Sequence, residues 1–82
     1  MKLNKGWTEG TIRIPGRNTF VHFYVKRYKR SGKYGIDGGR ICGLIINSKD
    51  DTLAYYAGEK GWVIKPKNEE AEIALQILLL EN

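Results

Sequence analysis

"TFVHFYVKRYK", residues 19 to 29, alternates between two kinds of side chain at successive positions. Val21, Phe23 and Val25 fall on one face, together with Arg27. The other face is aromatic and basic, and its members are Phe20, His22, Tyr24, Lys26 and Tyr28. Because successive side chains of a strand point to opposite faces, this alternation predicts a half-buried β-strand whose first set lies in the core.

Residues 7 to 14, WTEGTIRI, alternate in the same way and predict a strand that precedes this one. The two are separated by PGRN, in which Pro15 presets φ for the second position of a turn and Gly16 allows positive φ at the third. This predicts a type II turn and an antiparallel hairpin. We expect Trp7, at the start of the hairpin, and Trp62 to be core or helix-packing aromatics.

Further strands are expected after a glycine-rich loop of about ten residues, 30 to 39. Residues 40 to 47, RICGLIIN, are apolar on both faces and predict the most buried, central strand. TLAYYA, residues 52 to 57, predicts a fourth strand, and WVIK, residues 62 to 65, predicts a fifth strand or a continuation of the fourth.

Pro66 ends the sheet region, and the rest of the chain has the pattern of a helix. Asn68 is placed to cap its N-terminus, glutamates follow where the helix dipole favours anions, and the apolar run reaches about Leu80. The element order predicts an α+β fold. It is a four- or five-stranded antiparallel β-meander followed by one C-terminal helix packed on one sheet face, in a single domain over residues 1–82.

Apolar residues cover well over half of the expected helix surface, which is more than one sheet face can bury. Either the fold clasps the helix on two sides, or its outer stripe packs against a second copy of the chain. We favour a homo-oligomer, a dimer through the C-terminal helix, because a domain of 82 residues has little material with which to cover that stripe.

The net charge of +5 is unevenly distributed along the chain. Residues 13 to 40 carry eight Lys/Arg and one acid, whereas residues 41 to 82 carry four Lys and seven acids. The basic half predicts an anionic partner. The chain has no apolar stretch long enough for a membrane span, and its N-terminus lacks the apolar region of a signal peptide, so we expect a soluble, cytoplasmic protein.

Neither a metal site nor a catalytic centre is expected. The single Cys42 and the single His22 have no second residue of their own kind for a disulfide or a zinc site. Cys42 lies in a very apolar strand, where a thiol is usually inert, and no third residue orients the imidazole for nucleophilic catalysis. The sequence therefore predicts a non-enzymatic protein without a cofactor.

The strongest candidate site is a cluster of cations and tyrosines in the second strand and the loop after it. Its members are Tyr24, Lys26, Tyr28, Lys29, Arg30, Lys33 and Tyr34, with Arg27 between them. Single-stranded nucleic acids are held by cations along the phosphates and by aromatic planes on which bases stack. The alternative is a solvated face whose lysines and arginines only keep an edge strand from aggregating.

Residues 35 to 40, GIDGGR, offer a weaker candidate, a nest of backbone N–H groups around a phosphate. Gly38 and Gly39 would supply N–H groups, and Arg40 would close the site. The segment fits neither the P-loop nor the dinucleotide-binding fingerprint. The alternative is that these glycines only serve turns with positive φ.

Four segments of the chain carry a resemblance to a known family: WTEGTI, YGIDGGRICGL, YYAGEKGW, and Pro66 with EEAEIALQILL. On these residues the chain resembles a family of small bacterial and phage proteins that carry a domain of unknown function. GIDGGRI with the later GW is the specific part. The resemblance implies a shared framework that comprises Gly35, Gly38, Gly39, Arg40 and Trp62, and it implies no activity.

The expected architecture is also similar to the transcriptional-coactivator and whirly type of single-strand binder, in which four antiparallel strands precede a dimerising helix. Such a likeness of fold does not by itself transfer function. Two functions remain open. One is a binding module for single-stranded nucleic acid or another phosphate-rich ligand such as a nucleotide. The other is a phage-type counter-defence protein, either an inhibitor of a host nucleic-acid-handling complex or an oligomeric sponge for a signalling nucleotide.

Overall fold

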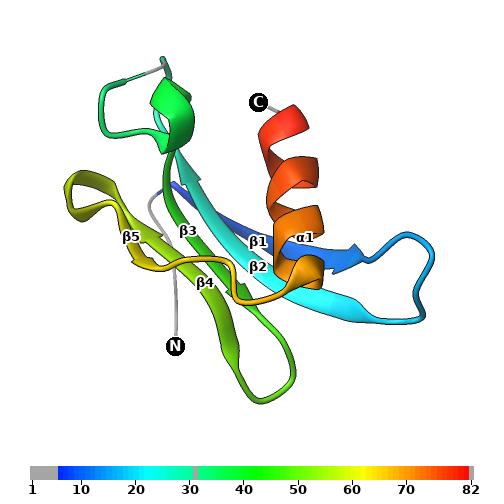
Figure 1. The fold of residues 1–82 in the computed structure, drawn as a ribbon. Coiled ribbons are helices and arrows are strands. Elements are labelled where there is room, and N and C mark those ends of the chain that lie inside the picture. Colours follow the sequence, from blue (N-terminus) through cyan, green and yellow to red (C-terminus); the bar gives the residue numbers. More distant parts are fainter. Residues whose placement is uncertain (1–5, 31, 82) are drawn as a thin grey trace.

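The computed structural model describes residues 6–30 and 32–81, which form one sheet and one α-helix (Figure 1). The elements are β1 Trp7–Arg13, β2 Phe20–Arg27, β3 Ile41–Asn47, β4 Thr52–Ala57, β5 Trp62–Ile64 and α1 Glu69–Leu80. Short 3-10 turns, Ile36–Gly38 and Gly58–Lys60, precede β3 and β5. Residues 1–5, at the basic start of the chain, Ser31 of the glycine-rich loop and Asn82 lie outside the described residues.

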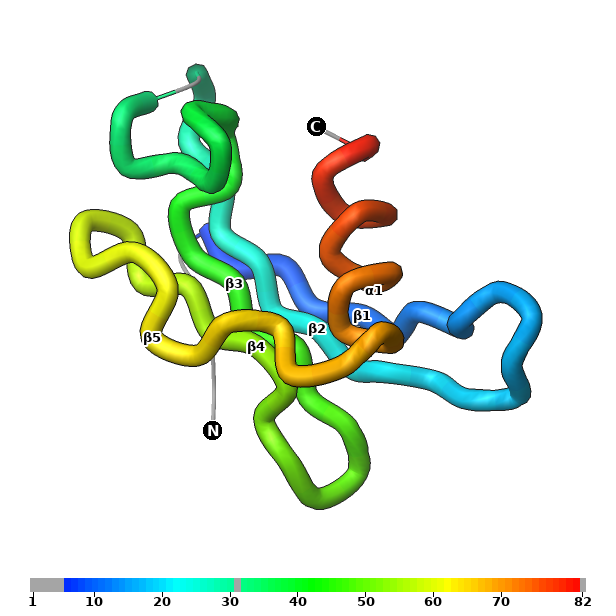
Figure 2. The backbone as a smooth tube through the Cα atoms, in the orientation of Figure 1, coloured from blue at the N-terminus to red at the C-terminus, as the bar shows by residue number. Residues whose placement is uncertain are grey.

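The sheet is antiparallel throughout, in the order β1-β2-β3-β4-β5, so each strand pairs with its neighbours in sequence. α1 packs on one face of this sheet, against β2 and β3 (Figures 1 and 2). This arrangement confirms the predicted α+β meander with a C-terminal helix. Residues 62–64 form a separate fifth strand, which pairs with β4.

The predicted turn between β1 and β2 is present, and it also holds the start of the helix. The Arg17 N–H donates to the Ile14 carbonyl (3.1 Å), and Gly16 has a φ of 77°. The Arg17 guanidinium pairs with the carboxylates of Glu69 and Glu70. The tip of the hairpin is therefore joined to the first turn of α1 by charge-assisted contacts.

The core lies between α1 and the sheet face that carries Val25 and Leu44. Its members with no exposed surface are Ile14, Val25, Ile41, Leu44, Ile46, Ala54, Ala71 and Ala74. Three of these belong to β3, which confirms that residues 40 to 47 hold the central and most buried strand. Burying each large aliphatic side chain contributes about 1.5–3 kcal/mol, so this layer is the main source of stability.

β2 ends at Arg27, two residues earlier than the sequence predicts. The ladder with β3 shifts its register between Lys26 and Arg27, and the Tyr28 N–H then donates to the Arg40 carbonyl (2.7 Å). A bulge of this kind interrupts the alternation of side chains. Tyr28 and the residue after it therefore leave the strand and enter the glycine-rich loop.

The two tryptophans lie on opposite faces of the sheet. Trp62 packs edge-on against Tyr56 at the margin of the core, with ring centroids 5.1 Å apart, as expected. Trp7 is the partner of Lys26 in the β1–β2 ladder and lies on the face away from α1. The expectation that Trp7 packs in the core or on the helix is therefore wrong, because the register assigns the core-facing positions of β1 to its neighbours.

The helix is capped and partly clasped by the fold. The Asn68 side chain accepts a hydrogen bond from the Ala71 N–H (2.9 Å), as its cap position predicts. Ile73 and Leu79 pack against the core from the sides of α1, whereas Leu80 is 84% exposed. The fold thus covers part of the apolar surface that the sequence assigns to a second copy, and the dimer stays a prediction.

A candidate binding trough on the open sheet face

α1 covers one face of the sheet, and the opposite face, here called the open face, carries rows of paired residues. One row crosses all five strands, and its partners in order are Glu9, Tyr24, Ile45, Tyr55 and Ile64. The next row consists of Trp7, Lys26, Gly43 and Ala57. Because directly paired residues point to the same side of a sheet, both rows lie on the face that α1 leaves uncovered.

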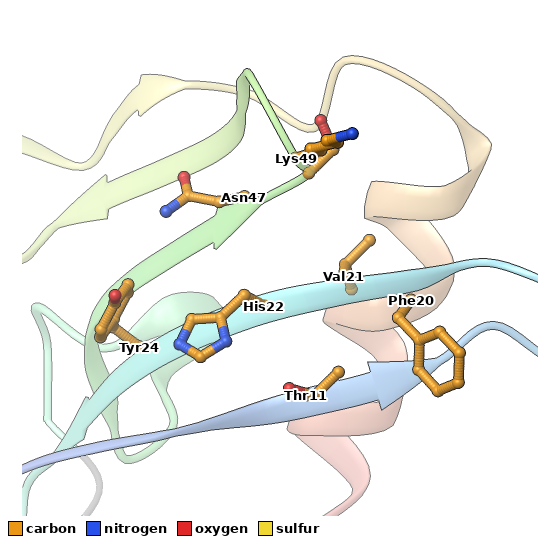
Figure 3. A pocket seen from close by; sticks show the side chains of 8 residues that line it. Thr11, Phe20, Val21, His22, Tyr24, Asn47 and Lys49 are labelled. Carbon is orange, nitrogen blue, oxygen red and sulfur yellow. The ribbon is translucent and has the colours of Figure 1, made fainter.

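Three shallow hollows follow one another across the open face, with volumes of about 470, 520 and 310 Å³. Phe20 and His22 line the first, which Figure 3 shows, and Tyr24 and Asn47 line both the first and the second. Tyr55 lines both the second and the third. The third is also lined by Trp7, Lys26, Tyr28 and Gly43. We call this continuous series the trough.

The ring of Tyr24 is held in place within the trough. The His22 ring meets it edge-on, with centroids 4.9 Å apart, and His22 Nε2 lies 3.0 Å from Glu9 Oε2. An edge-to-face contact holds each ring in a preferred orientation relative to the other, and it does not cover both faces of either ring. Tyr24 is therefore a supported aromatic surface in the middle of the trough.

The third hollow contains a second aromatic group and a tyrosine hydroxyl. Partial burial, followed by the neighbouring Cys42 thiol, raises the pKa of Tyr28 above its usual value of 10.0. The hydroxyl therefore stays protonated and neutral at physiological pH. The Trp7 indole lies over Gly43 beside it, because only a glycine leaves room for the ring there.

The charge of the trough is positive. Lys49 lines the first hollow and Lys26 lines the third, and no described residue that lines any of the three hollows is acidic. Acids lie at the edges of the trough: Glu9 is on the open face and contacts His22, and a neighbouring hollow at the β3–β4 turn is lined by Asp50 and by Asp51, which pairs with Lys67 at 3.2 Å. Aromatic surfaces and cations thus occur together in the three hollows, with acids beside them.

The structure divides the predicted site residues between two regions. Tyr24 and Lys26 lie in the trough, and Tyr28 lies at its end. Lys29, Arg30, Lys33 and Tyr34 belong to the loop beyond β2, and all four are exposed. Within that loop the Lys33 ammonium lies 5.0 Å from the centre of the Tyr34 ring, and the Tyr56 hydroxyl donates to the Tyr34 carbonyl (2.9 Å). The loop is therefore anchored to β4 and presents its cations to solvent.

The glycine-rich part of the loop uses its N–H groups internally. Gly38 and Gly39 donate to the carbonyls of Gly35 and Ile36, at 3.0 and 2.9 Å. Arg40 Nε donates to the Tyr28 carbonyl at 2.9 Å and so ties the two ends of the loop together. A phosphate nest needs N–H groups that are free to donate, and those of Gly38 and Gly39 are not. These hydrogen bonds place the glycines in turns, but only Gly38 has the expected positive φ (73°), whereas Gly35 and Gly39 have φ of −77° and −90°.

Three residues of the trough lie outside the site that the sequence predicts: Trp7, Tyr55 and Asn47. Alternation along β1 puts Trp7 on the same face as Glu9, so a signal for it existed in the sequence. For Tyr55 the sequence pattern is ambiguous, because Tyr56 follows it and only one of the two can face the core. Nothing in the sequence marks Asn47 as a site residue, because asparagine is common where a strand ends in a turn.

The described residues contain no group of three His, Cys, Asp or Glu side chains that could hold a metal ion. His22 pairs with Asn47 in the sheet, whereas the Cys42 thiol lies near the carbonyl of Lys26, at 3.5 Å. The sheet register therefore separates the thiol from the imidazole. Within the same part of the chain, the helix is too short and too polar at its start to cross a membrane.

Comparison with known proteins gives a family and no function. The family described as "Domain of unknown function (DUF7678)" matches residues 6–81. No curated protein and no solved structure matches the chain. Since the match spans the sheet, the trough and the helix together, the chain belongs to the DUF7678 family, whose function is unknown.

Proposed function

We propose that this protein is a small binding module that holds single-stranded nucleic acid along the trough of its open face. The observation that carries the proposal is the continuity of the trough. It joins Tyr24, Tyr55 and Trp7 with Lys26 and has no acidic side chain in its lining. Single-strand binders combine aromatic platforms for bases with cations for phosphates, and they need little sequence-specific contact.

The spacing of the open face suits a ligand with a regular repeat. Tyr24 and Lys26 are two residues apart on β2, which corresponds to about 6.6 Å along a strand. That distance is close to one step of an extended nucleotide chain. An aromatic ring and a cation at this separation place a base on Tyr24 and a phosphate beside Lys26.

The loop after β2 supports the same proposal. Lys29, Arg30 and Lys33 are exposed and follow directly from the end of the trough at Tyr28. A strand that leaves the trough at this end passes these cations. Their contribution is electrostatic, so it is independent of base sequence and weakens as salt is added.

The proposal is tested by fluorescence anisotropy of a labelled oligonucleotide titrated with the protein at low and at physiological salt. We expect affinity to fall steeply with salt, with a log–log slope of about −0.7 for each phosphate contacted on a single strand. Absence of binding at low salt would overturn the proposal.

A counter-defence role in a phage is the second candidate, and it needs a docking surface, for which α1 with its exposed Leu80 is available. An apolar side chain at the end of a half-covered helix suits docking on a protein, either a host complex or a second copy. In this role oligonucleotides bind weakly. An inhibitor is then expected to capture a host complex, and a sponge is expected to bind one small nucleotide in a saturable site.

A further inference from the structure

Asn47 lies in the floor of the trough, where the first and second hollows meet. The β3–β4 ladder shifts its register between Ile46 and Asn47, and such irregularities turn a side chain away from the regular pleat. Figure 3 shows the amide nitrogen of Asn47 on the side of Tyr24. The hollow beyond it is lined by Tyr55. Asn47 lies in the row next to the one formed by Tyr24, Ile45 and Tyr55, so its amide borders the hollow that both tyrosines line.

The side-chain carbonyl of Asn47 is buried and has no hydrogen-bond partner in the described part of the chain. Leaving a buried polar group unpaired is costly, so native proteins seldom do it without a reason. The usual structural role of such an asparagine would be to close the turn that follows.

That structural role is already filled by the next residue. The Ser48 N–H donates to the Asp51 carbonyl at 2.8 Å, and the Ser48 hydroxyl lies 3.5 Å from the same oxygen. Asn47 is not needed to close this turn. The buried carbonyl oxygen cannot reach a ligand, so the group that Asn47 directs toward Tyr24 and the trough is its NH₂ (Figure 3).

We infer that Asn47 binds the edge of a nucleobase whose ring stacks on Tyr24, an inference that rests on the proposed function. The amide NH₂ group is a hydrogen-bond donor, so it pairs with an acceptor on the base. Every nucleobase carries such an acceptor at its edge, either a carbonyl oxygen, as in thymine and uracil, or a ring nitrogen, as in adenine. The contact therefore needs a base but does not select one base, and it is lost where the base is missing.

The test compares oligothymidine with an abasic oligonucleotide of the same sugar–phosphate backbone, each of about 12 nucleotides, by fluorescence anisotropy at one fixed salt concentration. The wild-type protein is expected to prefer oligothymidine. Asn47→Leu keeps a similar side-chain volume and removes both polar atoms. It is expected to reduce the ratio of the two affinities about fivefold, the effect of losing one neutral hydrogen bond. Its Tm is expected to stay the same or rise, because the unpaired carbonyl is gone.

Two further variants make the test specific. Gln76→Leu removes an exposed amide from α1, on the covered side of the sheet, and is expected to leave the ratio unchanged. Asn47→Asp keeps the shape of the side chain and lacks the NH₂ donor, so it is expected to lower the ratio as well, even if Asn47→Leu does not fold.

The outcomes separate this inference from the proposed function. Wild-type protein that binds both oligonucleotides equally, or Asn47 variants that keep the wild-type ratio, would overturn the role of Asn47 and leave binding of phosphates by the cations of the trough standing. Wild-type protein that binds neither oligonucleotide would overturn both the role of Asn47 and the proposed function. A ratio that falls in the Asn47 variants and stays at the wild-type value in Gln76→Leu would support the inference.

Discussion

Trp7 reaches across β2 to Gly43 on β3: a Cβ atom at Gly43 would lie 2.8 Å from the indole Cη2. Lys26 lies between them, as the ladder partner of both residues. Real Cβ atoms essentially never come this close to another heavy atom, so the indole can lie there only over a glycine. Gly43 therefore makes the space for the aromatic surface at one end of the trough.

Gly43→Ala is expected to displace the Trp7 indole while the sheet remains folded. The atom in conflict is the far end of a half-buried side chain, which can move more cheaply than backbone. We expect a changed tryptophan emission spectrum and an affinity for oligonucleotide lower by about 1 kcal/mol, the lower limit for losing one stacked base. An unchanged spectrum together with unchanged affinity would contradict the position of Trp7 in the trough.

Tyr24→Leu and Tyr55→Leu are expected to weaken oligonucleotide binding by about 1–3 kcal/mol each, because each removes one aromatic surface from the trough. Anisotropy titrations give the affinities, and circular dichroism checks that the variants remain folded. If both variants bind as tightly as the wild type, stacking in the trough is not how the ligand is held.

Lys26→Ala combined with Arg30→Ala is expected to make the salt dependence of binding shallower. Each cation that contacts a phosphate contributes about 0.7 to the log–log slope, so the pair contributes about 1.4. Lys67→Ala is the matched control, because Lys67 pairs with Asp51 and lies outside the trough. Equal slopes for the double variant and the control would show that the cations act without contacting phosphates.

Leu80→Glu is expected to convert a dimer to a monomer, provided that the helix forms the dimer contact. Leu80 is 84% exposed, so a charge there costs the isolated monomer little. Leu79 would be a poor choice for this experiment, because it packs against the core and its substitution would also destabilise the fold. Light scattering gives the molar mass, and a wild-type protein that is already monomeric would refute the predicted dimer.

Asn68→Ala is expected to lower the free energy of unfolding by about 1 kcal/mol, because Asn68 accepts the Ala71 N–H at the start of α1. Urea denaturation measures the change. Asn18→Ala, in the exposed turn between β1 and β2, is a control for the loss of the amide alone. Equal losses in the two variants would mean that the cap does not stabilise the helix.

Local patterns along the chain were enough to predict the fold. The alternation in residues 19–29, the apolar run in residues 40–47 and the cap at Asn68 each specify an element, and every strand pairs with its neighbour in sequence. The alternation predicts a strand that runs two residues beyond the observed end of β2, because the bulge after Lys26 arises from pairing with β3 and leaves no mark in the sequence of β2 alone.

The candidate site was only half visible in the sequence, because it is assembled from several strands. Tyr24 and Lys26 could be assigned to one face from the alternation of β2. Their association with Tyr55 and Asn47 depends on the register of β3 and β4, which the sequence does not specify. The loop glycines show a second limit of the sequence. A glycine-rich segment has the same sequence whether its N–H groups are free or bonded within the loop, and the N–H of Gly38 is bonded within the loop.

The most direct test of the trough is a two-dimensional NMR spectrum of ¹⁵N-labelled protein, recorded before and after addition of oligothymidine. The two tryptophans provide an internal comparison, because the Trp7 indole lies in the trough and the Trp62 indole lies at the core margin on the other face. We expect the Trp7 indole N–H and the backbone amides around Tyr24 and Tyr55 to shift, while the Trp62 indole and α1 do not. Shifts confined to α1 and Trp62, or no shifts at all, would contradict binding on the open face.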